Sequence, residues 1–386
     1  MNTLPLNLKL VFVFAHLSCF HILIPVSAKV FLSIDCGSSA LKLYTDENSI
    51  EWVGDGPYIQ TGDVHKVHSP ANISRFDSNV LNTLRAFPNR NKNCYSIDID
   101  IKDEDNTTVE RVLVRANFYY GNYDNKSSPP IFDLQFNGNH WQQITTAENN
   151  VYIYEVVFSL NKGNHINVCL AQTKPDNIPF ISALEVRSLD SEAYSYIPSD
   201  RPMIFMDRVA FGTNEVIRYP EDSFDRIWDW TGPLGNTSTL TKVRSNSPSI
   251  KVDAVDKPPE AVLRTALMRL NSSEDMFLVP PTNLTVPLHF NAYFSEMIKL
   301  NSTQKRSFDI IVNSNLDNRT SIDPKGPVIP PYGGGLEVHI HNVTTFRSRF
   351  LLEFTRTNDS TLPSLINALE WYIIGDKLVQ GTNSDD

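Results

Sequence analysis

Clusters of basic residues and long apolar runs are both scarce in this sequence of 386 residues. There are 34 Lys and Arg against 44 Asp and Glu, which gives a formal net charge of −10. Nucleic acid is therefore not an expected partner, because binding to phosphate backbones depends on clustered positive charge. Only one apolar run is long, and it lies at the N-terminus, so we expect no transmembrane span in the mature chain.

The N-terminal run has the pattern of a secretory signal peptide. Lys9 precedes an apolar stretch that reaches Ile24, and small residues follow up to Ala28. We expect cleavage there, which removes residues 1–28. A signal anchor is the alternative, because about 18 to 20 apolar residues can span a bilayer. Residues 377–386 form a polar tail, unlike a lipid-anchor signal. The mature chain is thus expected to be secreted or at the cell surface.

Cysteine is rare as well. Cys19 falls in the signal, which leaves Cys36, Cys94 and Cys169. In an oxidising compartment these three allow one disulfide with one thiol left over, in any of three pairings. Buried thiols are equally compatible with the strand-like segments that contain them.

Glycosylation signals, in contrast, are abundant. Asn-x-Ser/Thr triplets without proline begin at Asn72, Asn106, Asn125, Asn236, Asn271, Asn283, Asn301, Asn318, Asn342 and Asn358. They support an extracellular location. They also indicate that much of the surface is open to glycan, and we therefore expect a monomer.

Signatures of catalysis are missing. The sequence has no G-x-S-x-G or H-E-x-x-H motif and no cysteine–histidine nucleophile pattern. Asp98 and Asp100 could serve glycoside hydrolysis, but they alternate with isoleucines along a predicted strand, where solubility explains them better. His339 and His341 face the same way on another strand, yet no cysteine or acidic cluster completes a zinc site. We expect a solvated strand face there, and no enzyme activity, metal or cofactor.

The pattern that is present is alternation with a period of two. Segments such as "YSIDIDIK" (95–102) and "LEVHIH" (336–341) place apolar residues on one face. Helical periodicity is limited to short runs, "SNVLNTLRAF" (78–87) and "PPEAVLRTALMRL" (258–270). Prolines (24) and glycines (16) punctuate the strands, as in β-sandwiches and jelly rolls. The sequence predicts an all-β fold with a few short helices.

The chain also contains an internal repeat. "FYYGNYDNKSSPPIFDLQFN" (118–137) aligns without gaps to "FSEMIKLNSTQKRSFDIIVN" (294–313), and "FISALEV" (180–186) matches "LINALEW" (365–371). Two ordered matches predict tandem modules of similar fold. We place module 1 at residues 29–195 and module 2 at 196–376, followed by the tail 377–386.

Several segments resemble the plant malectin-like domain, the tandem ectodomain of many plant receptor kinases, especially those in which it precedes leucine-rich repeats. They include "SIDCGSS" (33–39), "TLRAFPNRNKNCYSI" (83–97), "VRANFYYGNYD" (114–124), "RYPEDSFDRIWDW" (218–230) and "LPSLINALEWY" (362–372). The resemblance covers about residues 30 to 375 and implies two malectin-type β-sandwiches side by side. Those receptors continue into repeats, a membrane helix and a kinase. A sequence that ends at "QGTNSDD" is then either a stand-alone secreted module or a truncated chain.

A tyrosine cluster is the first candidate binding site. Alternation places Tyr119 on the polar side of its strand, and Tyr120, Tyr123 and Asp124 follow. Exposed rings stack on the C–H faces of sugars, while carboxylates bind the hydroxyls. The resemblance adds that the animal lectin malectin stacks a diglucoside at the end of this strand, where Tyr123 is the closest match. The alternative is that Tyr120 and Tyr123 fold back onto "PPIFD" (129–133).

The segment "FDRIWDW" (224–230) is the second candidate. Trp228 and Trp230, with the aspartates beside them, could bind sugar, although spacing by two is typical of a buried strand. In the competing hypothesis this segment, with Tyr194 and Tyr196, lines a cleft between the modules that binds a secreted peptide or co-receptor. The primary prediction is a non-catalytic module that binds cell-wall oligosaccharide. The alternative is a protein-binding module without sugar affinity.

Overall fold

The fold is that of a computed structural model. It describes residues 30–379 except for 39–43, 70–78, 100–110, 161–164, 231–238, 272–273, 280–285, 316–317, 322–325 and 345–350. The predicted signal peptide lies outside the described residues. Within the described part of the chain, we find no helix of the length and apolarity that crossing a membrane requires.

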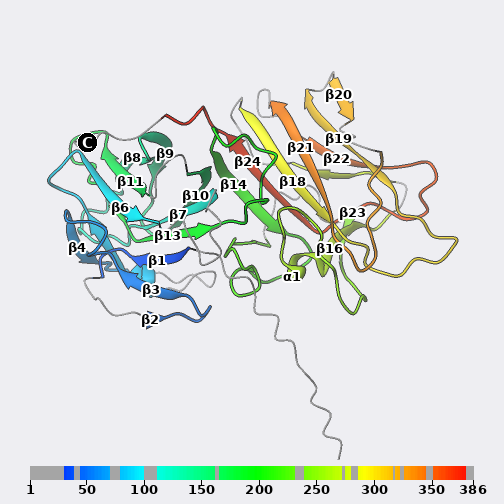
Figure 1. The fold of residues 1–386 in the computed structure, drawn as a ribbon, viewed down its shortest axis with the longest axis horizontal. Helices are drawn as coiled ribbons and strands as arrows, with labels where there is room; N and C mark the ends of the chain where they lie inside the picture. Colours follow the sequence, from blue (N-terminus) through cyan, green and yellow to red (C-terminus); the bar gives the residue numbers. More distant parts are fainter. Residues whose placement is uncertain are drawn as a thin grey trace, which may run out of the picture.

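Two β-sandwich modules share one long sheet (Figure 1), in the strand order β2-β3-β1-β13-β7-β10-β14-β24-β18-β21. The elements of the first half are β1 (Phe31–Asp35), β2 (Tyr44–Thr45), β3 (Glu51–Gly54), β4 (Asp63–Lys66), η1 (Val80–Asn82), β5 (Thr83–Ala86), β6 (Lys92–Asp98), β7 (Arg111–Tyr119), β8 (Ile131–Phe136), β9 (Asn139–Thr145), β10 (Val151–Ser159), β11 (His165–Gln172), β12 (Phe180–Ile181) and β13 (Ala183–Ser188). Those of the second half are β14 (Met203–Ala210), β15 (Leu240–Arg244), α1 (Glu260–Leu263), β16 (Thr265–Arg269), β17 (Met276–Leu278), β18 (Pro287–Phe294), β19 (Phe308–Asn315), β20 (Asn318–Ser321), β21 (Leu336–Thr344), β22 (Leu351–Arg356), β23 (Leu365–Ile366) and β24 (Ala368–Ile374).

The second half repeats the strand order of the first. The run β1-β13-β7-β10 corresponds to β14-β24-β18-β21, and the four-stranded sheet β6-β11-β8-β9 corresponds to β17-β22-β19-β20. The aligned residues Phe118 and Phe294 lie on the equivalent strands β7 and β18. The internal repeat and the all-β fold of two tandem sandwiches are therefore confirmed. The boundary between residues 195 and 196 falls in the connection between β13 and β14, and it stays a prediction.

Each half has its own hydrophobic core between the shared sheet and the sheet packed on it. The first core includes Ile34, Tyr95, Val114, Phe118, Phe132, Trp141, Leu170 and Leu184. The second includes Val209, Phe290, Phe294, Phe308, Ile340, Phe354, Leu369 and Trp371. Leucine, isoleucine, phenylalanine and tryptophan side chains of this kind each contribute about 1.5 to 3 kcal/mol when buried.

The opposite face of the shared sheet is covered too. Leu189, Ala193, Tyr194 and Phe224, from the long connections, pack against β7, β10, β14 and β24. Strand β7 is consequently buried along its entire length, including the side that alternation marks as polar. The expectation that this side faces solvent was wrong, because loops without any periodic pattern cover it.

The two short runs with helical periodicity form less helix than expected. Residues Val80–Asn82 form one 3-10 turn and Glu260–Leu263 one α-helical turn. Each run then continues as a strand, β5 or β16, that pairs on both sides. Pairing with neighbouring strands outweighs the weak helical preference of these residues.

One disulfide joins the strands of the first module. Cys94 on β6 lies directly opposite Cys169 on β11, and the two are bonded. Cys36 is a buried free thiol. Among the three pairings that the sequence allowed, strand register thus selects one.

Residues 375–379 return from β24 to the first module, as Figure 1 shows in red. The amide of Gly375 donates to the carbonyl of Pro202 at 2.9 Å, and the amide of Val379 donates to Asn139 Oδ1 at 2.9 Å. Leu378 packs against the first core. Residues 377–379, the described part of the predicted polar tail, therefore connect the end of the second module to the first module.

Candidate binding site

The three tyrosines of the predicted sugar platform are buried. Tyr119, Tyr120 and Tyr123 are 2%, 0% and 6% exposed. The ring of Tyr123 packs 5.0 Å from His65 and 5.8 Å from Phe180, and the Tyr120 hydroxyl donates to Asp124. Burial raises the pKa of Tyr120 to about 12. These rings therefore pack in the interior, Tyr123 against His65 and Phe180, and do not form an exposed stacking surface.

Tyr119 is buried for a separate reason. It lies on the face predicted to be solvated, where Ile50, Trp52 and Leu81 cover it. Its hydroxyl donates to the carbonyl of Ser69 at 2.8 Å. The prediction of an exposed Tyr119 was therefore wrong, because the segments around β3 and η1 fold over the end of β7.

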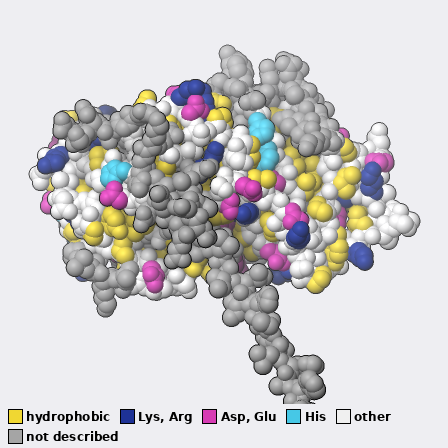
Figure 2. Space-filling model, viewed as in Figure 1, with side chains coloured by type: hydrophobic (Ala, Val, Ile, Leu, Met, Phe, Trp, Pro, Cys, Tyr) yellow, Lys and Arg dark blue, Asp and Glu magenta, His cyan; other side chains and the backbone are white. Residues whose placement is uncertain are grey.

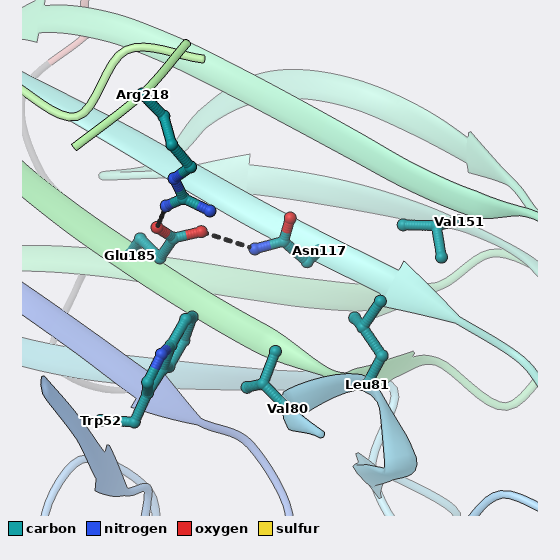
Figure 3. Close-up of a pocket in the computed structure, with 7 residues that line it drawn as sticks. All are labelled: Trp52, Val80, Leu81, Asn117, Val151, Glu185 and Arg218. Carbon is teal, nitrogen blue, oxygen red and sulfur yellow. Dashed lines mark hydrogen bonds and ion pairs between the residues drawn. The ribbon is translucent and has the colours of Figure 1, made fainter. Parts of the chain in front are cut away.

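A small cavity adjoins this cluster (Figure 3). It is lined by Trp52, Val80, Leu81, Asn117, Val151, Glu185 and Arg218 and has a volume of about 10 Å³. Asn117 Nδ2 and Arg218 Nη2 both donate to Glu185, at 2.9 and 3.2 Å. A cavity needs roughly 10 to 15 Å³ to hold one water molecule. This one therefore has no room for a sugar ring.

Most of "FDRIWDW" is also interior. Asp225, fully buried, accepts hydrogen bonds from Arg115, Arg187 and Arg218 at 3.3, 2.7 and 2.8 Å. Burial opposes ionisation of this carboxyl, but the three arginines hold its pKa well below the ordinary value. Trp228 is 0% exposed and donates its indole N–H to Asp222 at 2.8 Å. Packing is the correct interpretation of Trp228, and it is not part of a partner surface.

The remaining aromatic candidates differ in how much of each side chain is exposed. Tyr194 is 0% exposed, and its hydroxyl donates to Glu370 at 3.1 Å, so this residue is not available to a partner either. Tyr196 is half-buried, and its ring stacks 4.8 Å from that of His289. Trp230 is 40% exposed. Trp230 is thus the one of these four aromatic residues that presents a large surface to solvent.

Beside Trp230 lies a groove that the sequence did not reveal. It has a volume of about 510 Å³, and its lining residues are Thr213, Glu215, Val216, Ile217, Glu221, Arg244, Glu260, Ala261, Arg264 and Thr265. Lys242 connects it to the tryptophan, because its Nζ lies 5.9 Å from the Trp230 ring and donates to the Thr213 carbonyl at 3.0 Å. No motif marks these residues, since the groove forms between two segments separated in sequence.

The groove carries charges of both signs. Glu215, Glu221 and Arg244 are exposed, and Arg264 pairs with Glu260 at its edge. A glycine is required at the edge of the groove. Gly212 has a φ of +83°, and a Cβ atom on Gly212 would lie only 2.6 Å from the carbonyl oxygen of Ala266. The groove can therefore offer both hydrogen-bond donors and acceptors to a ligand.

Four of the ten predicted glycosylation sites are shown to lie at exposed positions. Asn125, Asn271, Asn301 and Asn358 are exposed. Asn318 and Asn342 lie in β20 and β21. The other four, Asn72, Asn106, Asn236 and Asn283, lie outside the described residues. Attachment of glycan at any of them stays a prediction.

The predicted solvated face of β21 is only half correct. His341 is exposed, but three quarters of the His339 side chain is covered, and its ring lies 3.9 Å from that of Tyr196. Figure 2 shows histidine side chains gathered over β18 and β21 with acidic side chains near them. Asp256 and Glu337 are the acidic residues that approach His339. The expectation that no acidic group stands nearby was wrong, because Asp256 arrives from a distant loop.

The fold and this surface define an all-β protein of two sandwich modules that offers a preformed groove. The chain belongs to the malectin-like domain family, whose model matches residues 34–374.

Two relatives from Arabidopsis thaliana illustrate the range of chains that share this domain. The protein At1g24485 is 34% identical over 369 residues, covering 94% of this chain and 68% of its own length. The relative At2g19210, named as a leucine-rich repeat receptor-like protein kinase, is 30% identical and aligns with 92% of this chain. This chain spans only 39% of the length of that kinase.

Solved structures share the fold. The ectodomain of ANX1 from Arabidopsis thaliana has a TM-score of 0.73 at 17% identity, covering 92% of this chain and 98% of its own. A chain from the complex of the plant peptide RALF23 with FER and LLG2 has a TM-score of 0.70 at 18% identity, covering 92% and 99%.

Proposed function

We propose that this chain is an extracellular, non-catalytic binding module, that its partner is a secreted peptide or a co-receptor protein, and that the partner contacts the groove beside Trp230. The observation that carries this proposal is the groove itself. Its volume of about 510 Å³ falls in the range of roughly 300 to 1,000 Å³ that is typical of ligand sites.

The chemistry of the groove fits a polypeptide. Exposed Glu215 and Arg244 can pair with side chains of either charge, and the lining residues Ile217 and Ala261 add apolar surface. Near the groove, Trp230 supplies a large exposed ring, which Lys242 connects to the lining residue Thr213. Tryptophan and arginine are the residues that most often dominate the energy of protein interfaces.

The family gives independent support. A structural neighbour of this chain was solved in a complex with a plant peptide and a further protein. Relatives at about 30% identity are named as receptor kinases. We propose an extracellular location for this chain because it matches such receptors. Signalling is not part of the proposal, because this chain covers only the malectin-like part of those kinases.

Binding of cell-wall oligosaccharide is the competing function. A sugar site at Tyr119, Tyr120 or Tyr123 would require the core to open, because all three rings are buried. The exposed ring of Trp230, next to the half-exposed Asp229, is a better stacking surface. Sugar binding at Trp230 would be weak, since one stacking contact contributes roughly 1 kcal/mol beyond the buried area.

A matched set of variants tests the proposal. Wild type, Trp230→Ala and Arg244→Glu are compared for binding to a library of plant secreted peptides and to a glycan array. Tyr332→Ala and Arg90→Glu are the controls, because Tyr332 is similarly exposed at 37% and Arg90 is an exposed arginine outside the groove. We expect peptide binding that falls at least about tenfold in both groove variants, roughly 1.4 kcal/mol, and in neither control.

Other outcomes would redirect the assignment. Glycan binding that is lost in Trp230→Ala would favour the oligosaccharide function at the same surface. Peptide binding that is unaffected by Trp230→Ala and Arg244→Glu would overturn the groove as the contact site. A folded protein that binds neither class of ligand would overturn the proposed function.

A further inference from the structure

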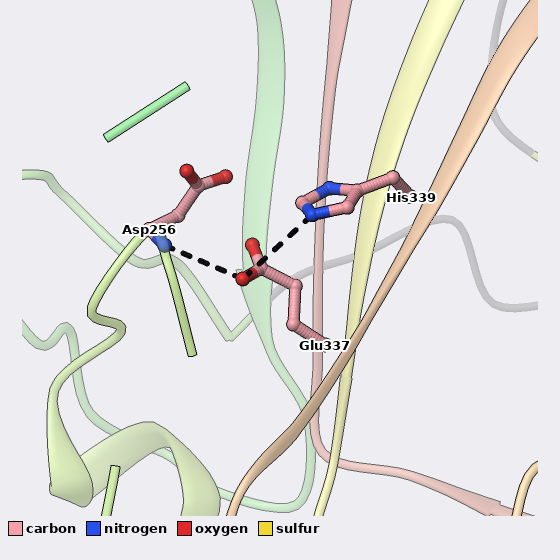
Figure 4. A group of neighbouring side chains, drawn as sticks. All are labelled: Asp256, Glu337 and His339. Carbon is pink, nitrogen blue, oxygen red and sulfur yellow. Dashed lines mark hydrogen bonds and ion pairs between the residues drawn. The ribbon is translucent and has the colours of Figure 1, made fainter. Parts of the chain in front are cut away.

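Three potential metal ligands converge at the edge of the second module (Figure 4). Glu337 and His339 project from β21 towards Asp256, which lies in the connection between β15 and α1. One carboxylate oxygen from each acidic residue and a ring nitrogen of His339 lie within 4.8 Å of one another. Strand periodicity explains part of this arrangement, because residues two apart on a strand point to the same face.

One oxygen atom of the ligand Glu337 has no hydrogen-bond partner. The Glu337 side chain is only 5% exposed, and its Oε1 is buried with no hydrogen bond. Its Oε2 accepts from the Asp256 amide at 3.3 Å and lies 3.9 Å from His339 Nε2. Leaving a buried carboxylate oxygen without a hydrogen bond is costly. The site is therefore built around an acceptor that the protein itself does not satisfy.

One arginine reaches this cluster, because Arg226 Nη1 donates to the backbone carbonyl of Asp256 at 2.7 Å. Among the ion pairs of the described residues, the contact to Glu337 comes from His339. Two carboxylates held this close require either a shared proton or a bound cation.

The surrounding side chains orient the ligands. Asn291 Nδ2 donates to Asp256 Oδ2 at 2.8 Å, and the backbone N–H of Tyr194 donates to Asp256 Oδ1 at 2.6 Å. Asn291 Oδ1 lies 3.1 Å from His339 Nδ1. When Nδ1–H donates to this oxygen, the lone pair of the ring is on Nε2, which faces Glu337. Metal-bound histidines are usually held by such a second hydrogen bond.

We propose that Asp256, Glu337 and His339 form a binding site for one Zn²⁺ ion, with water as the fourth ligand. One imidazole nitrogen and two carboxylate oxygens suit zinc, whereas Ca²⁺ and Mg²⁺ prefer six or more oxygen ligands. Tetrahedral zinc ligands at about 2.1 Å from the metal are about 3.4 Å apart. The three ligand atoms, which lie within 4.8 Å of one another, therefore move closer by up to about 1.4 Å on binding. The exposed quarter of the His339 side chain gives a metal ion in solution access to the site.

Direct metal binding tests the site. The full chain is secreted from eukaryotic cells without a histidine tag, treated with chelator and titrated with zinc chloride by calorimetry, with metal content measured by mass spectrometry. We expect one Zn²⁺ per chain and a loss of affinity of at least tenfold in Glu337→Gln and in His339→Gln. His341→Gln is the matched control, because His341 lies on the same face of β21 but outside the ligand set.

Thermal unfolding separates loss of the site from loss of the fold. Glu337→Gln keeps the shape of the side chain and removes one of two facing charges, so it should unfold in chelator at the same temperature as wild type or a higher one. Zinc should then raise the unfolding temperature of wild type and His341→Gln but not of Glu337→Gln. No zinc binding by wild type would overturn the proposal in favour of a shared proton. Equal losses in His339→Gln and His341→Gln, with Glu337→Gln unaffected, would overturn it in favour of the histidines alone.

Discussion

Arg208, on the first strand of the second module, donates to Glu155 on β10 of the first module at 2.8 Å, and both side chains are buried. The other Glu155 oxygen accepts from Arg115 at 3.0 Å, while Arg208 Nε donates to Glu370 at 2.8 Å. Burial alone would raise the pKa of Glu370, but Arg208 and Arg226 outweigh it and hold that pKa at about 2. A continuous chain of charges thus crosses from one module to the other.

The first prediction concerns this junction. Arg208→Met should lower the free energy of unfolding by about 3 to 5 kcal/mol, because it leaves Glu155 and Glu370 buried without their shared partner. Chemical denaturation followed by fluorescence measures the change. Lys305→Met is the control: its pair with Asp359 is exposed, so little or no change is expected. A loss as small as that of the control would show that the junction does not depend on this ion pair.

The second prediction concerns acid. The folded-state pKa of Asp225 lies below the value of an unfolded aspartate, about 3.9. Its contribution to stability is therefore present at neutral pH and is lost as the pH falls below about 4. We expect Asp225→Asn to be less stable than wild type at pH 7, with a difference that shrinks towards pH 3.

Denaturation curves at a series of pH values measure this difference. Asp63→Asn, which changes an exposed carboxylate, serves as the control and should not show a difference that depends on pH in this way. If the gap between wild type and Asp225→Asn were constant from pH 7 to pH 3, the three arginines would not be what keeps Asp225 ionised.

The third prediction concerns Tyr123. Tyr123→Ala should cost about 3 kcal/mol or more, as for other large aromatic side chains removed from a core, because the ring packs against His65, Tyr120 and Phe180. Tyr123→Phe keeps the ring and should be much closer to wild type. Thermal and chemical unfolding report the cost. A folded Tyr123→Ala of wild-type stability that had lost a glycan ligand would restore the sugar-platform hypothesis.

The fourth prediction concerns the cysteines. The disulfide closes a loop with a sequence separation of 75, so the double variant Cys94→Ser/Cys169→Ser should lose about 4 kcal/mol. Alkylation in denaturant without reductant, followed by peptide mapping, should label Cys36 and leave the other two linked. Labelling of Cys94 or Cys169 under these conditions would contradict the pairing. Cys36→Ala serves as the variant that removes a thiol and leaves the disulfide intact.

Strand alternation predicted the all-β fold and the repeat predicted two tandem modules, whereas the arrangement as two sandwiches side by side came from the family resemblance. Both signals are local, because a strand buried on one face repeats every two residues and a duplicated module repeats its pattern. Phe118 and Phe294 occupy equivalent places, as the alignment of their segments required. Alternation gave a wrong prediction on β7, because it assumes that one face of a strand is open to solvent. Tyr119 and Arg115 lie on a face that the rule assigns to solvent, yet both are buried.

The site could be predicted only in part for a similar reason. Trp230 was among the candidates, but the groove beside it forms from the segments 213–221 and 244–265, which share no motif. Likewise, "HIH" suggested two metal ligands without a third. The proposed site keeps only His339 of these two and adds Glu337 and Asp256, which lies 81 residues before Glu337. Contacts between segments this far apart depend on the folded path of the chain, which neither spacing nor composition records.

The shared sheet has a consequence for how a partner can be recognised. Strands β10 and β14 pair through Val156–Ile204 and Val157–Met203. A hinge motion between the two modules would therefore break backbone hydrogen bonds as well as the Glu155–Arg208 ion pair. A ligand that touches both modules therefore meets a rigid, preformed platform. Such a platform loses little conformational entropy on binding, and affinity should be tuned by side chains and loops rather than by domain motion.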